Sequence, residues 1–195
     1  SWLQELVETK STIEELGESL SIAGFEVESI ENLSTKAKGV VVGFVEQCEK
    51  HPNADKLSVC KVNIGKGTHL QIVCGASNIK SKIHVLVATP GAYLSTIDLH
   101  IKRSELRGIT SEGMICSSSE LGIESESDGI TILEELNIEI PTLGESVLGI
   151  FGLNDVIIDL AITANRPDGM SILGIAKEVA ALTGKNIIEP KLYKK

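Results

Sequence analysis

Aromatic side chains are scarce in this sequence, since phenylalanine, tryptophan and tyrosine make up 3% of its 195 residues. Proteins that hold unpaired nucleic-acid bases commonly stack those bases on aromatic rings. The six aromatic residues are Trp2, Phe25, Phe44, Tyr93, Phe151 and Tyr193. So few rings exclude base stacking as the main mode of any nucleic-acid binding.

Long apolar runs and closely paired cysteines are also missing. No run approaches the roughly 18 residues that a bilayer-spanning helix needs, so we expect no membrane span. The four cysteines, at positions 48, 60, 74 and 116, form no Cys-x-x-Cys pair, which argues against a zinc knuckle or a thioredoxin-type centre. The first three lie in apolar, strand-like segments, where cysteine usually behaves as a small buried hydrophobe. Reduced thiols of this kind predict a reducing compartment, the cytoplasm.

The usual patterns of catalytic sites are absent as well. The four histidines, at positions 51, 69, 84 and 100, are scattered and not clustered with other metal ligands. The serine run 117–119 lacks a Gly-x-Ser-x-Gly frame, and Gly65-Lys66-Gly67 is not followed by the Gly-Lys-Ser/Thr of a phosphate-binding loop. We therefore predict no catalytic residue, no metal site and no cofactor in this chain, and leave open whether it is itself an enzyme.

Acidic side chains outnumber basic ones by 27 to 18, for a net charge of −9, but the charge is unevenly distributed. Residues 50–107 carry nine basic and three acidic groups, whereas residues 108–151 carry nine acidic groups and no basic one. Charges act over a Debye length of about 8 Å, so the first segment could attract a phosphate backbone while the second orients it by repulsion. The same lysines could equally be solvated strand edges. Charge alone does not decide between the two.

Residues 39–116 have the pattern of short strands at close spacing. Apolar segments at 40–48, 57–64, 70–74 and 83–88, with shorter pieces near 99–101 and 113–116, are separated by glycine or proline. Five or six strands within about 75 residues are typical of a small β-barrel. The acidic segment that follows is looser, with a helical turn expected at 118–121 and a short strand near 130–133.

Each end of the chain combines one strand with one amphipathic helix. Residues 11–24 are predicted to form a helix that begins at capping boxes on Ser11 and Thr12 and ends at Gly24, followed by a strand. A second strand and helix follow residue 152, where Asp168 or Ser171 is the expected helix cap. Arg166, just before that cap, could instead anchor a carboxylate of another domain.

Neither end is long enough to stabilise a core alone, because segments of about 40 residues bury too little surface. Together they supply two strands and two helices, enough for two packed layers. We therefore predict an α+β fold in which a β-barrel domain, residues 39–151, is inserted into a discontinuous two-layer α+β domain, residues 1–38 plus 152–195.

Three motifs carry a family resemblance. Glu-x-His-Pro-Asn-Ala-Asp-Lys-Leu at 49–57, Ile-Val-Cys-Gly-Ala at 72–76 and Leu-Arg-Gly-Ile-Thr-Ser-Glu-Gly-Met-Ile-Cys-Ser at 106–117 resemble the tRNA-binding OB-fold of the endothelial-monocyte-activating-polypeptide type. The segment 163–184 looks like the element that follows this barrel in the β subunit of bacterial phenylalanyl-tRNA synthetases. It departs from the family at Gly169-Met170, where a larger residue and leucine are common. The tail 190–195 has no match and is expected to be linker.

This resemblance implies an OB-fold barrel and a tRNA-binding, non-catalytic N-terminal part of a longer β subunit. In that family two α and two β subunits form the ligase that attaches phenylalanine to its tRNA, and this reaction uses ATP and magnesium. The implied partners are tRNA, the α subunit and the remaining β-subunit domains, without a membrane. Two alternatives stay open: an architectural module that docks on other subunits with little tRNA contact, and a stand-alone tRNA-binding protein.

Candidate RNA contacts follow from the basic residues of the barrel. OB barrels bind oligonucleotides over the face of their second and third strands and over adjoining loops. Lysine and arginine directed at the phosphate backbone suit a folded tRNA that is recognised by its shape. The residues predicted to contact RNA are Lys56, Lys61, Lys80, Lys82, Lys102, Arg103 and Arg107.

Overall fold

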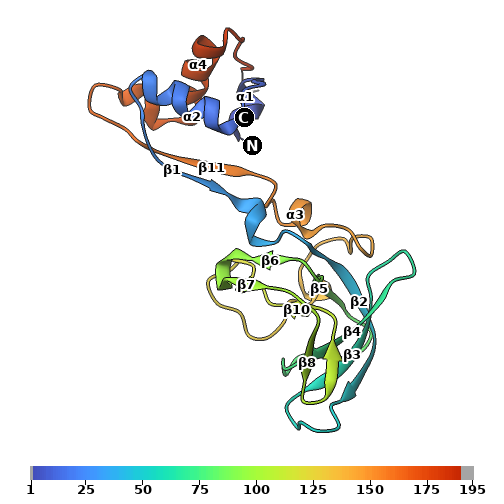
Figure 1. The fold of residues 1–195 in the computed structure, drawn as a ribbon. Coiled ribbons are helices and arrows are strands. Elements are labelled where there is room, and N and C mark those ends of the chain that lie inside the picture. Colours follow the sequence, from blue (N-terminus) through green and yellow to red (C-terminus); the bar gives the residue numbers. More distant parts are fainter. Residues whose placement is uncertain (1, 190–195) are drawn as a thin grey trace. The chain divides into compact units, whose positions relative to one another are not determined.

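The computed structural model describes residues 2–189; Ser1 and the tail 190–195, where a linker is predicted, lie outside the described residues. The chain divides into two compact units (Figure 1). The first, which we call the terminal unit, joins the residues up to Asn32 with those from Asp155 onward. The second, the barrel unit, comprises residues 33–154.

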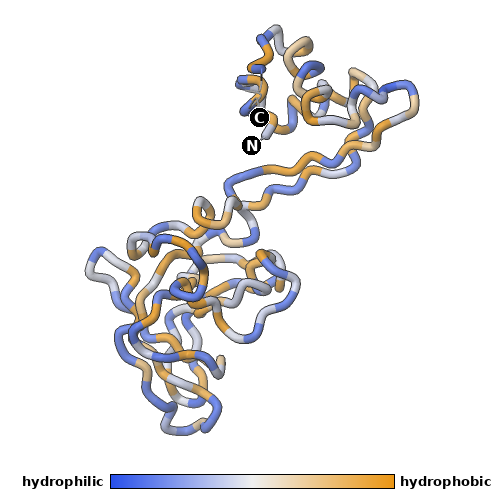
Figure 2. Tube along the Cα trace, turned by 180° about the vertical axis from the view of Figure 1, so that it is seen from behind, coloured by the Kyte–Doolittle hydropathy of each residue, from blue (hydrophilic) through white to orange (hydrophobic). Residues whose placement is uncertain are grey.

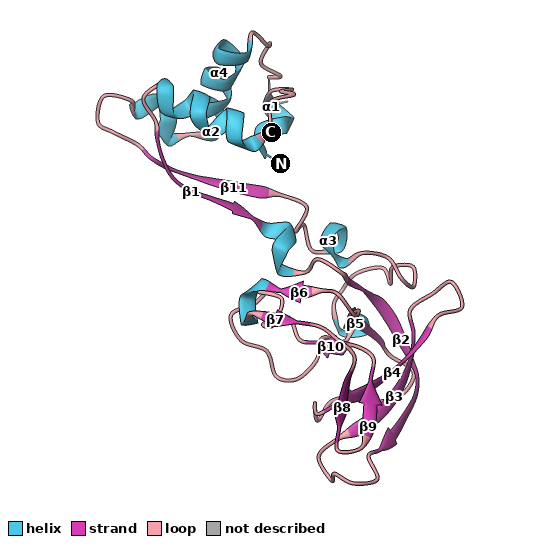
Figure 3. Cartoon of the chain, in the orientation of Figure 1, coloured by secondary structure: helices cyan, strands magenta, loops and turns pink. Residues whose placement is uncertain are grey.

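The terminal unit contains helices from both ends of the chain and a two-stranded antiparallel sheet (Figure 3). Glu26 pairs with Ala161 at one end of this sheet and Asn32 with Val156 at the other. Of the two strands, the second is the more apolar (Figure 2). The elements are α1 (Trp2–Leu6), α2 (Ile13–Ile22), β1 (Glu26–Asn32), β11 (Val156–Ala161), the 3-10 helix η4 (Pro167–Met170) and α4 (Ile172–Thr183).

Capping residues set the ends of the two long helices. Thr12 and Glu15 form a reciprocal capping box at α2, whereas Ser11 bonds Thr9 and takes no part in it. Ser171 caps α4 by accepting a hydrogen bond from the Gly174 amide at 3.0 Å. Of the two alternatives for this cap, Ser171 is therefore the one that forms.

Both ends of the chain contribute to one core, which explains why neither needs to be stable alone. Leu16, Leu20 and Phe25 from the N-terminal part pack with Ile175 and Val179 of α4, and all five are buried. The amide of Ile188 also donates to the carbonyl of Leu6 at 2.7 Å. The predicted fold class, with a barrel inserted into a discontinuous α+β body, is confirmed.

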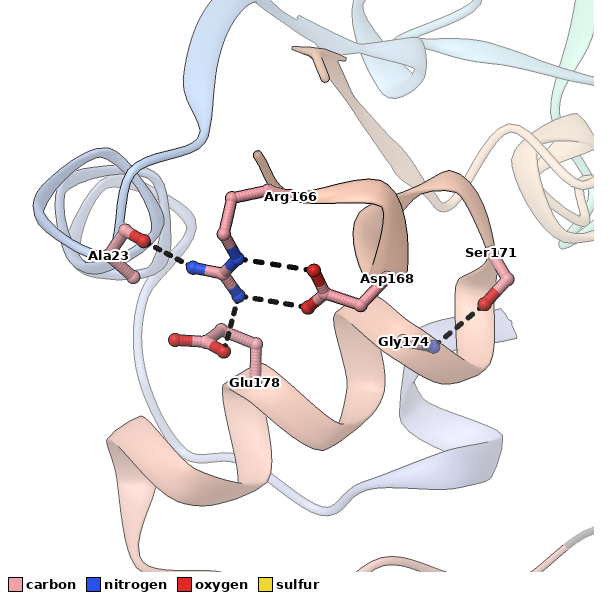
Figure 4. Close-up of polar contacts among 6 residues, drawn as sticks. All are labelled: Ala23, Arg166, Asp168, Ser171, Gly174 and Glu178. Atoms are coloured by element: carbon pink, nitrogen blue, oxygen red, sulfur yellow. Dashed lines mark hydrogen bonds and ion pairs between the residues drawn. The ribbon is translucent and has the colours of Figure 1, made fainter. Parts of the chain in front are cut away.

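Arg166 joins the two halves of the terminal unit through several contacts at once (Figure 4). Its guanidinium donates to both carboxylate oxygens of Asp168, to Glu178 at 2.7 Å and to the carbonyl of Ala23. It also lies 4.1 Å from the centre of the Phe25 ring. The alternative in which Arg166 anchors a carboxylate of another domain is not supported, because each of these partners belongs to the terminal unit.

The barrel unit is built on a curled five-stranded antiparallel sheet in the order β10-β5-β2-β3-β4. Long β2 pairs with β5 through its first half and with β3 through its second half, and a bulge lies between Val45 and Gln47 in the pairing with β3. The strands are β2 (Val40–Lys50), β3 (Ser58–Asn63), β4 (His69–Cys74), β5 (His84–Ala88) and β10 (Met114–Cys116). The main predicted strands are thus confirmed.

Contacts between β4 and the segment before β10 close the sheet on itself. Gln71 and Glu112 join their backbones, with the Glu112 amide donating to the Gln71 carbonyl at 2.7 Å. The amide of Val73 donates to the hydroxyl of the buried Ser111 at 3.0 Å. A partly closed five-stranded barrel of this kind agrees with the OB-fold that the resemblance implied.

Smaller elements complete the barrel unit, and several differ from expectation. Residues 118–121 form hydrogen-bonded turns instead of a helical turn, and near 130–133 a single bridge from Ile132 to Val85 replaces the expected strand. The β6–β7 and β8–β9 hairpins were not predicted from the sequence. The remaining elements are η1 (Leu33–Lys36), β6 (Tyr93–Leu94), η2 (Ser95–Ile97), β7 (Leu99–His100), β8 (Ser104–Leu106), β9 (Ile109–Ser111), η3 (Leu133–Glu135) and α3 (Val147–Ile150).

The boundaries of the compact units follow from which side chains enter the barrel core. Ala37 and Leu153 are buried in that core, and Leu33 packs against it. The units therefore change at 32/33 and 154/155. The domain limits inferred from the sequence, 38/39 and 151/152, stay a prediction. Within residues 2–189, no helix combines the length and the apolar character needed to cross a membrane.

A substitution at Gly169 is a test of how closely the terminal unit is packed. A Cβ there would lie 2.3 Å from the Phe25 ring, which is itself buried, so the ring has little room to move. We expect Gly169→Ala to destabilise the terminal unit by about 1–3 kcal/mol through overpacking. Amide hydrogen exchange of α4 measures the change. Met170→Ala, at the exposed neighbouring position, is the control and should leave exchange nearly unaltered.

The Arg166–Asp168 pair predicts an acid-sensitive terminal unit. The Arg166 hydrogen bonds outweigh desolvation and hold the pKa of Asp168 below its ordinary value of 3.8. Because the folded-state pKa is the lower one, the ionised carboxylate stabilises the fold above pH 3.8, and this contribution disappears as the pH falls through the folded-state pKa. The stability difference between the wild type and Asp168→Asn should therefore be largest near neutral pH and vanish in strong acid. A difference that stays constant with pH would contradict this account.

Candidate nucleic-acid interface

The turn between β2 and β3 is fixed from within by backbone bonds and by the ring of His51. The His51 amide donates to the Leu57 carbonyl at 3.0 Å, which closes the turn 51–57. The imidazole Nδ1 accepts from the Asn53 amide, also at 3.0 Å. His51 is 5% exposed, so it is buried within this turn.

The same histidine attaches this turn to a second one. Its Nε2 lies 3.0 Å from the carbonyl of Leu106, at the end of the β8–β9 hairpin, and donates to it because Nδ1 is the acceptor. The side-chain amide of Asn53 donates to the next carbonyl, that of Arg107, at 3.1 Å. Arg107 and Gly108 both have positive φ, which makes the two-residue hairpin turn tight. Two turns far apart in sequence thus form one end of the barrel.

A hollow of about 620 Å³ lies beside this end. Its walls come from the end of β4, from residues 99–106 and from the serine-rich stretch after β10. Lys102 and His100 contribute cationic or polar groups, while Leu106 and Ile101 contribute apolar surface. The hollow therefore offers apolar and hydrogen-bonding surface in one place, as a site for a nucleotide requires.

The seven predicted contact residues are all exposed, and five of them lie in three places. Lys56 and Arg107 belong to the two joined turns, and Lys102 lines the neighbouring hollow. Lys80 and Lys82 lie in the loop after β4, where the Lys82 ammonium is 5.6 Å from the centre of the Phe44 ring.

Lys61 and Arg103 are already engaged in ion pairs. Lys61 lies 3.4 Å from a Glu46 oxygen, and Arg103 lies 2.7 Å from Glu112. The hydrogen bond from His69 keeps the pKa of Glu46 below its ordinary value, against the opposing effect of desolvation. The positive charges of Lys61 and Arg103 are therefore partly neutralised, so these side chains are less available to bind a phosphate group.

The acidic and basic segments of the sequence are not separate surfaces. Glu112 from the acidic segment binds Arg103, and Glu134 binds the ring of His84 at 2.7 Å. This mixing arises because β10 pairs with β5 and the segment before it pairs with β4. At these two contacts the acidic and basic segments meet, so a charge count along the chain does not describe the surface there.

Hydroxyl groups along one wall of the hollow were not identified from the sequence. Glu120 accepts hydrogen bonds from the amide and the hydroxyl of Ser117, at 2.8 and 2.9 Å. The Ser119 and Ser127 hydroxyls lie 2.7 Å apart. The serine run 117–119 is the feature of the sequence that marks this wall.

The described residues do not fit ATP and magnesium as resident groups. Among residues 2–189, no three His, Cys, Asp or Glu side chains come together as a metal site would require. Gly65-Lys66-Gly67 forms the tight turn between β3 and β4, with all three residues at positive φ. Its geometry is that of a hairpin turn, not of a loop that leads into a helix and cradles phosphates.

Comparison with known proteins agrees with this geometry. The model of a family described as putative tRNA binding domain matches residues 40–139. That match spans more than half of the chain and all the strands of the barrel unit. The chain belongs to the putative tRNA binding domain family.

Similarity extends beyond this tRNA-binding domain to both ends of the chain. Phenylalanine–tRNA ligase β subunits of Prochlorococcus marinus strain MIT 9313 and Synechococcus sp. strain CC9902 are 58% and 57% identical over 192 residues, 98% of this chain. The chain spans 24% of the length of those proteins. The solved C-terminal domain of Plasmodium vivax p43 is 26% identical with a TM-score of 0.41, and the match covers 57% of this chain and 59% of that one. The family resemblance predicted from the motifs is confirmed.

Because His51 attaches the two turns to each other, its removal should lower the stability of the tRNA-binding domain. His51→Ala removes the bonds to Leu106 and Asn53, so we expect about 1–2 kcal/mol of destabilisation in urea unfolding of the chain. His69→Ala serves as the control, because that exposed ring makes only a surface contact with Glu46. Equal losses for the two variants would show that His51 does not hold the turns together.

Proposed function

We propose that the barrel unit binds tRNA and that the chain is the tRNA-binding, non-catalytic N-terminal part of a phenylalanine–tRNA ligase β subunit. The observation that carries this proposal is the attachment of the 51–57 turn to the β8–β9 hairpin. It brings Lys56 and Arg107 to one end of the barrel, next to the hollow that Lys102 lines. The membership in the tRNA-binding family and the ligase relatives support it.

The mode of binding follows from what this surface contains. Its cations suit phosphates, while no phenylalanine, tyrosine or tryptophan lines the hollow as a platform for unpaired bases. We propose recognition of the tRNA backbone by shape and charge. Lys56, Arg107 and Lys102 would make the main contacts and Lys80 and Lys82 would extend them. Lys61 and Arg103 contribute less, because carboxylates already pair with them.

The wider assignments rest on the relatives alone. We propose that the whole protein attaches phenylalanine to tRNA in the cytoplasm with ATP and magnesium, as a heterotetramer of two α and two β subunits. ATP and magnesium would then act outside these residues. The remaining β-subunit domains and the α subunit would be the protein partners of this chain.

A second role, docking within the ligase, is favoured by the surface of the terminal unit. Four of its large apolar side chains are strongly or substantially exposed: Ile22 at 87%, Met170 at 79%, Trp2 at 78% and Ile157 at 50%. Scattered single residues of this kind are normal, but this small unit carries most of those in the described chain. We propose the terminal unit as the architectural part and the barrel as the RNA-binding part.

Two lysines at opposite ends of β3 provide a matched test of tRNA binding. Lys56 lies in the β2–β3 turn and Lys66 in the β3–β4 turn, and both are exposed. We expect Lys56→Gln to weaken binding of folded tRNA and to lower the slope of log K against log salt by about one unit, because one phosphate contact is lost. Lys66→Gln removes the same charge and should leave both quantities nearly unchanged. Filter binding across a salt series measures them.

Equal weakening by the two variants would contradict the proposed surface, since it would show a response to overall charge only. Failure of the wild-type chain to bind tRNA even at low salt would contradict RNA binding by the barrel. In that case docking of the terminal unit would be the remaining function.

A further inference from the structure

Two cysteines face each other across the β2–β3 ladder. The register pairs Cys48 with Cys60 directly, and both are free thiols. Directly opposed residues of an antiparallel pair have their Cα atoms about 4.5–5.5 Å apart and project their side chains to the same face. A disulfide needs Cα atoms roughly 4.4–6.8 Å apart. The backbone therefore already has the spacing that a cross-strand disulfide requires.

The two thiols differ in how deeply they are buried. Cys60 is fully buried among the apolar residues inside the barrel, whereas Cys48 is half-buried at the edge of that cluster. Burial, together with the neighbouring Cys48, strongly raises the pKa of Cys60. Of the four cysteines, Cys48 is the one that is only half-buried, so it is the thiol that a reagent from solution reaches most easily, and it lies opposite the buried Cys60.

We propose that Cys48 and Cys60 form a reversible disulfide that ties β2 to β3 when the protein meets a low-molecular-weight disulfide such as oxidised glutathione. The Cys48 thiolate attacks one sulfur of the oxidant, which forms a mixed disulfide and releases one glutathione thiolate. Cys60 then gives its proton to a released glutathione thiolate and attacks the Cys48 sulfur, which forms the protein disulfide, breaks the mixed disulfide and releases the second glutathione as a thiolate. Two protein thiols are oxidised and one oxidant disulfide is reduced to two thiols, so atoms and electrons balance.

The other cysteines are poorly placed to compete. Cys60 stands opposite Ile72 on β4, so Cys74 is two residues further along and diagonal to it. Diagonal neighbours are about 7–8 Å apart, beyond the range of an unstrained disulfide. Cys116 is buried in the other half of the barrel core, and burial raises its pKa to about 12. The structure thus singles out one pair among the four cysteines.

The Cys48–Cys60 disulfide would constrain the end of the barrel at which the 51–57 turn meets the β8–β9 hairpin. It closes the segment 48–60, which contains the whole turn 51–57. Closing a segment of that length lowers the conformational entropy of the unfolded chain and so raises the free energy of unfolding. Oxidation should therefore raise the melting temperature of the barrel by about 5–10 °C. A reductant should reverse the rise. The second step should be slow, because the Cys60 thiol is reluctant to ionise.

Trypsin separates all four cysteines, which makes the pairing directly measurable. Cleavage after lysine and arginine places them in the peptides 39–50, 57–61, 67–80 and 108–177. After incubation of the folded chain with oxidised glutathione and without reduction, mass spectrometry should find 39–50 joined to 57–61. Cys48→Ser should abolish this species, whereas Cys116→Ser, the matched control, should retain it.

Three results would overturn the proposal: four free thiols, glutathione held permanently on Cys48, or a bond from either cysteine to Cys74. The peptide map of the wild-type chain distinguishes these outcomes without any variant, so a failure of one variant to fold does not weaken the test. Melting curves of oxidised and re-reduced protein provide the second readout. No change in melting temperature despite a mapped 48–60 bond would contradict its stabilising effect.

Discussion

The imidazole of His51 is the contact on which the proposed RNA-binding surface depends. One nitrogen of the ring accepts from its own turn and the other donates to the β8–β9 hairpin, so a single buried side chain satisfies polar groups of both. Asn53 repeats the connection one residue further along the hairpin. Without these bonds the tips of the two turns would not be attached to each other. With them, the cations of both turns and the neighbouring hollow form one continuous surface.

Features set by local chemistry were predictable from the sequence. The capping box at Thr12, the positive φ of Gly24 and the strands from Val40 to Ala88 depend on neighbouring residues, and the structure agrees with each. Long-range pairing of the two chain ends was also accessible, because each end carried an amphipathic helix and a strand too small to be stable alone. The barrel followed from the density of short strands. Its particular family followed from motifs, not from periodicity.

Features that depend on tertiary contacts were missed. The β8–β9 hairpin has strands of only three residues, the first of them exposed, and an Arg107-Gly108 turn, so neither alternation nor a common hairpin dipeptide marks it. Its order comes from contacts with the 51–57 turn and with β4, which lie far away in sequence. The same reason explains the pairing of Arg103 with Glu112, which cancels part of the charge that a count along the chain assigns to a basic segment. The partners of Arg166 likewise depended on how the helices pack.

Hydrogen exchange of the chain with and without folded tRNA at low salt tests the central claim most directly. The account predicts that tRNA slows exchange in the turn 51–57 and in residues 102–111, because both belong to the surface that the histidine assembles. The β3–β4 turn at 64–68, at the other end of β3, should exchange at an unchanged rate. Protection confined to the terminal unit, or to that β3–β4 turn, would contradict it.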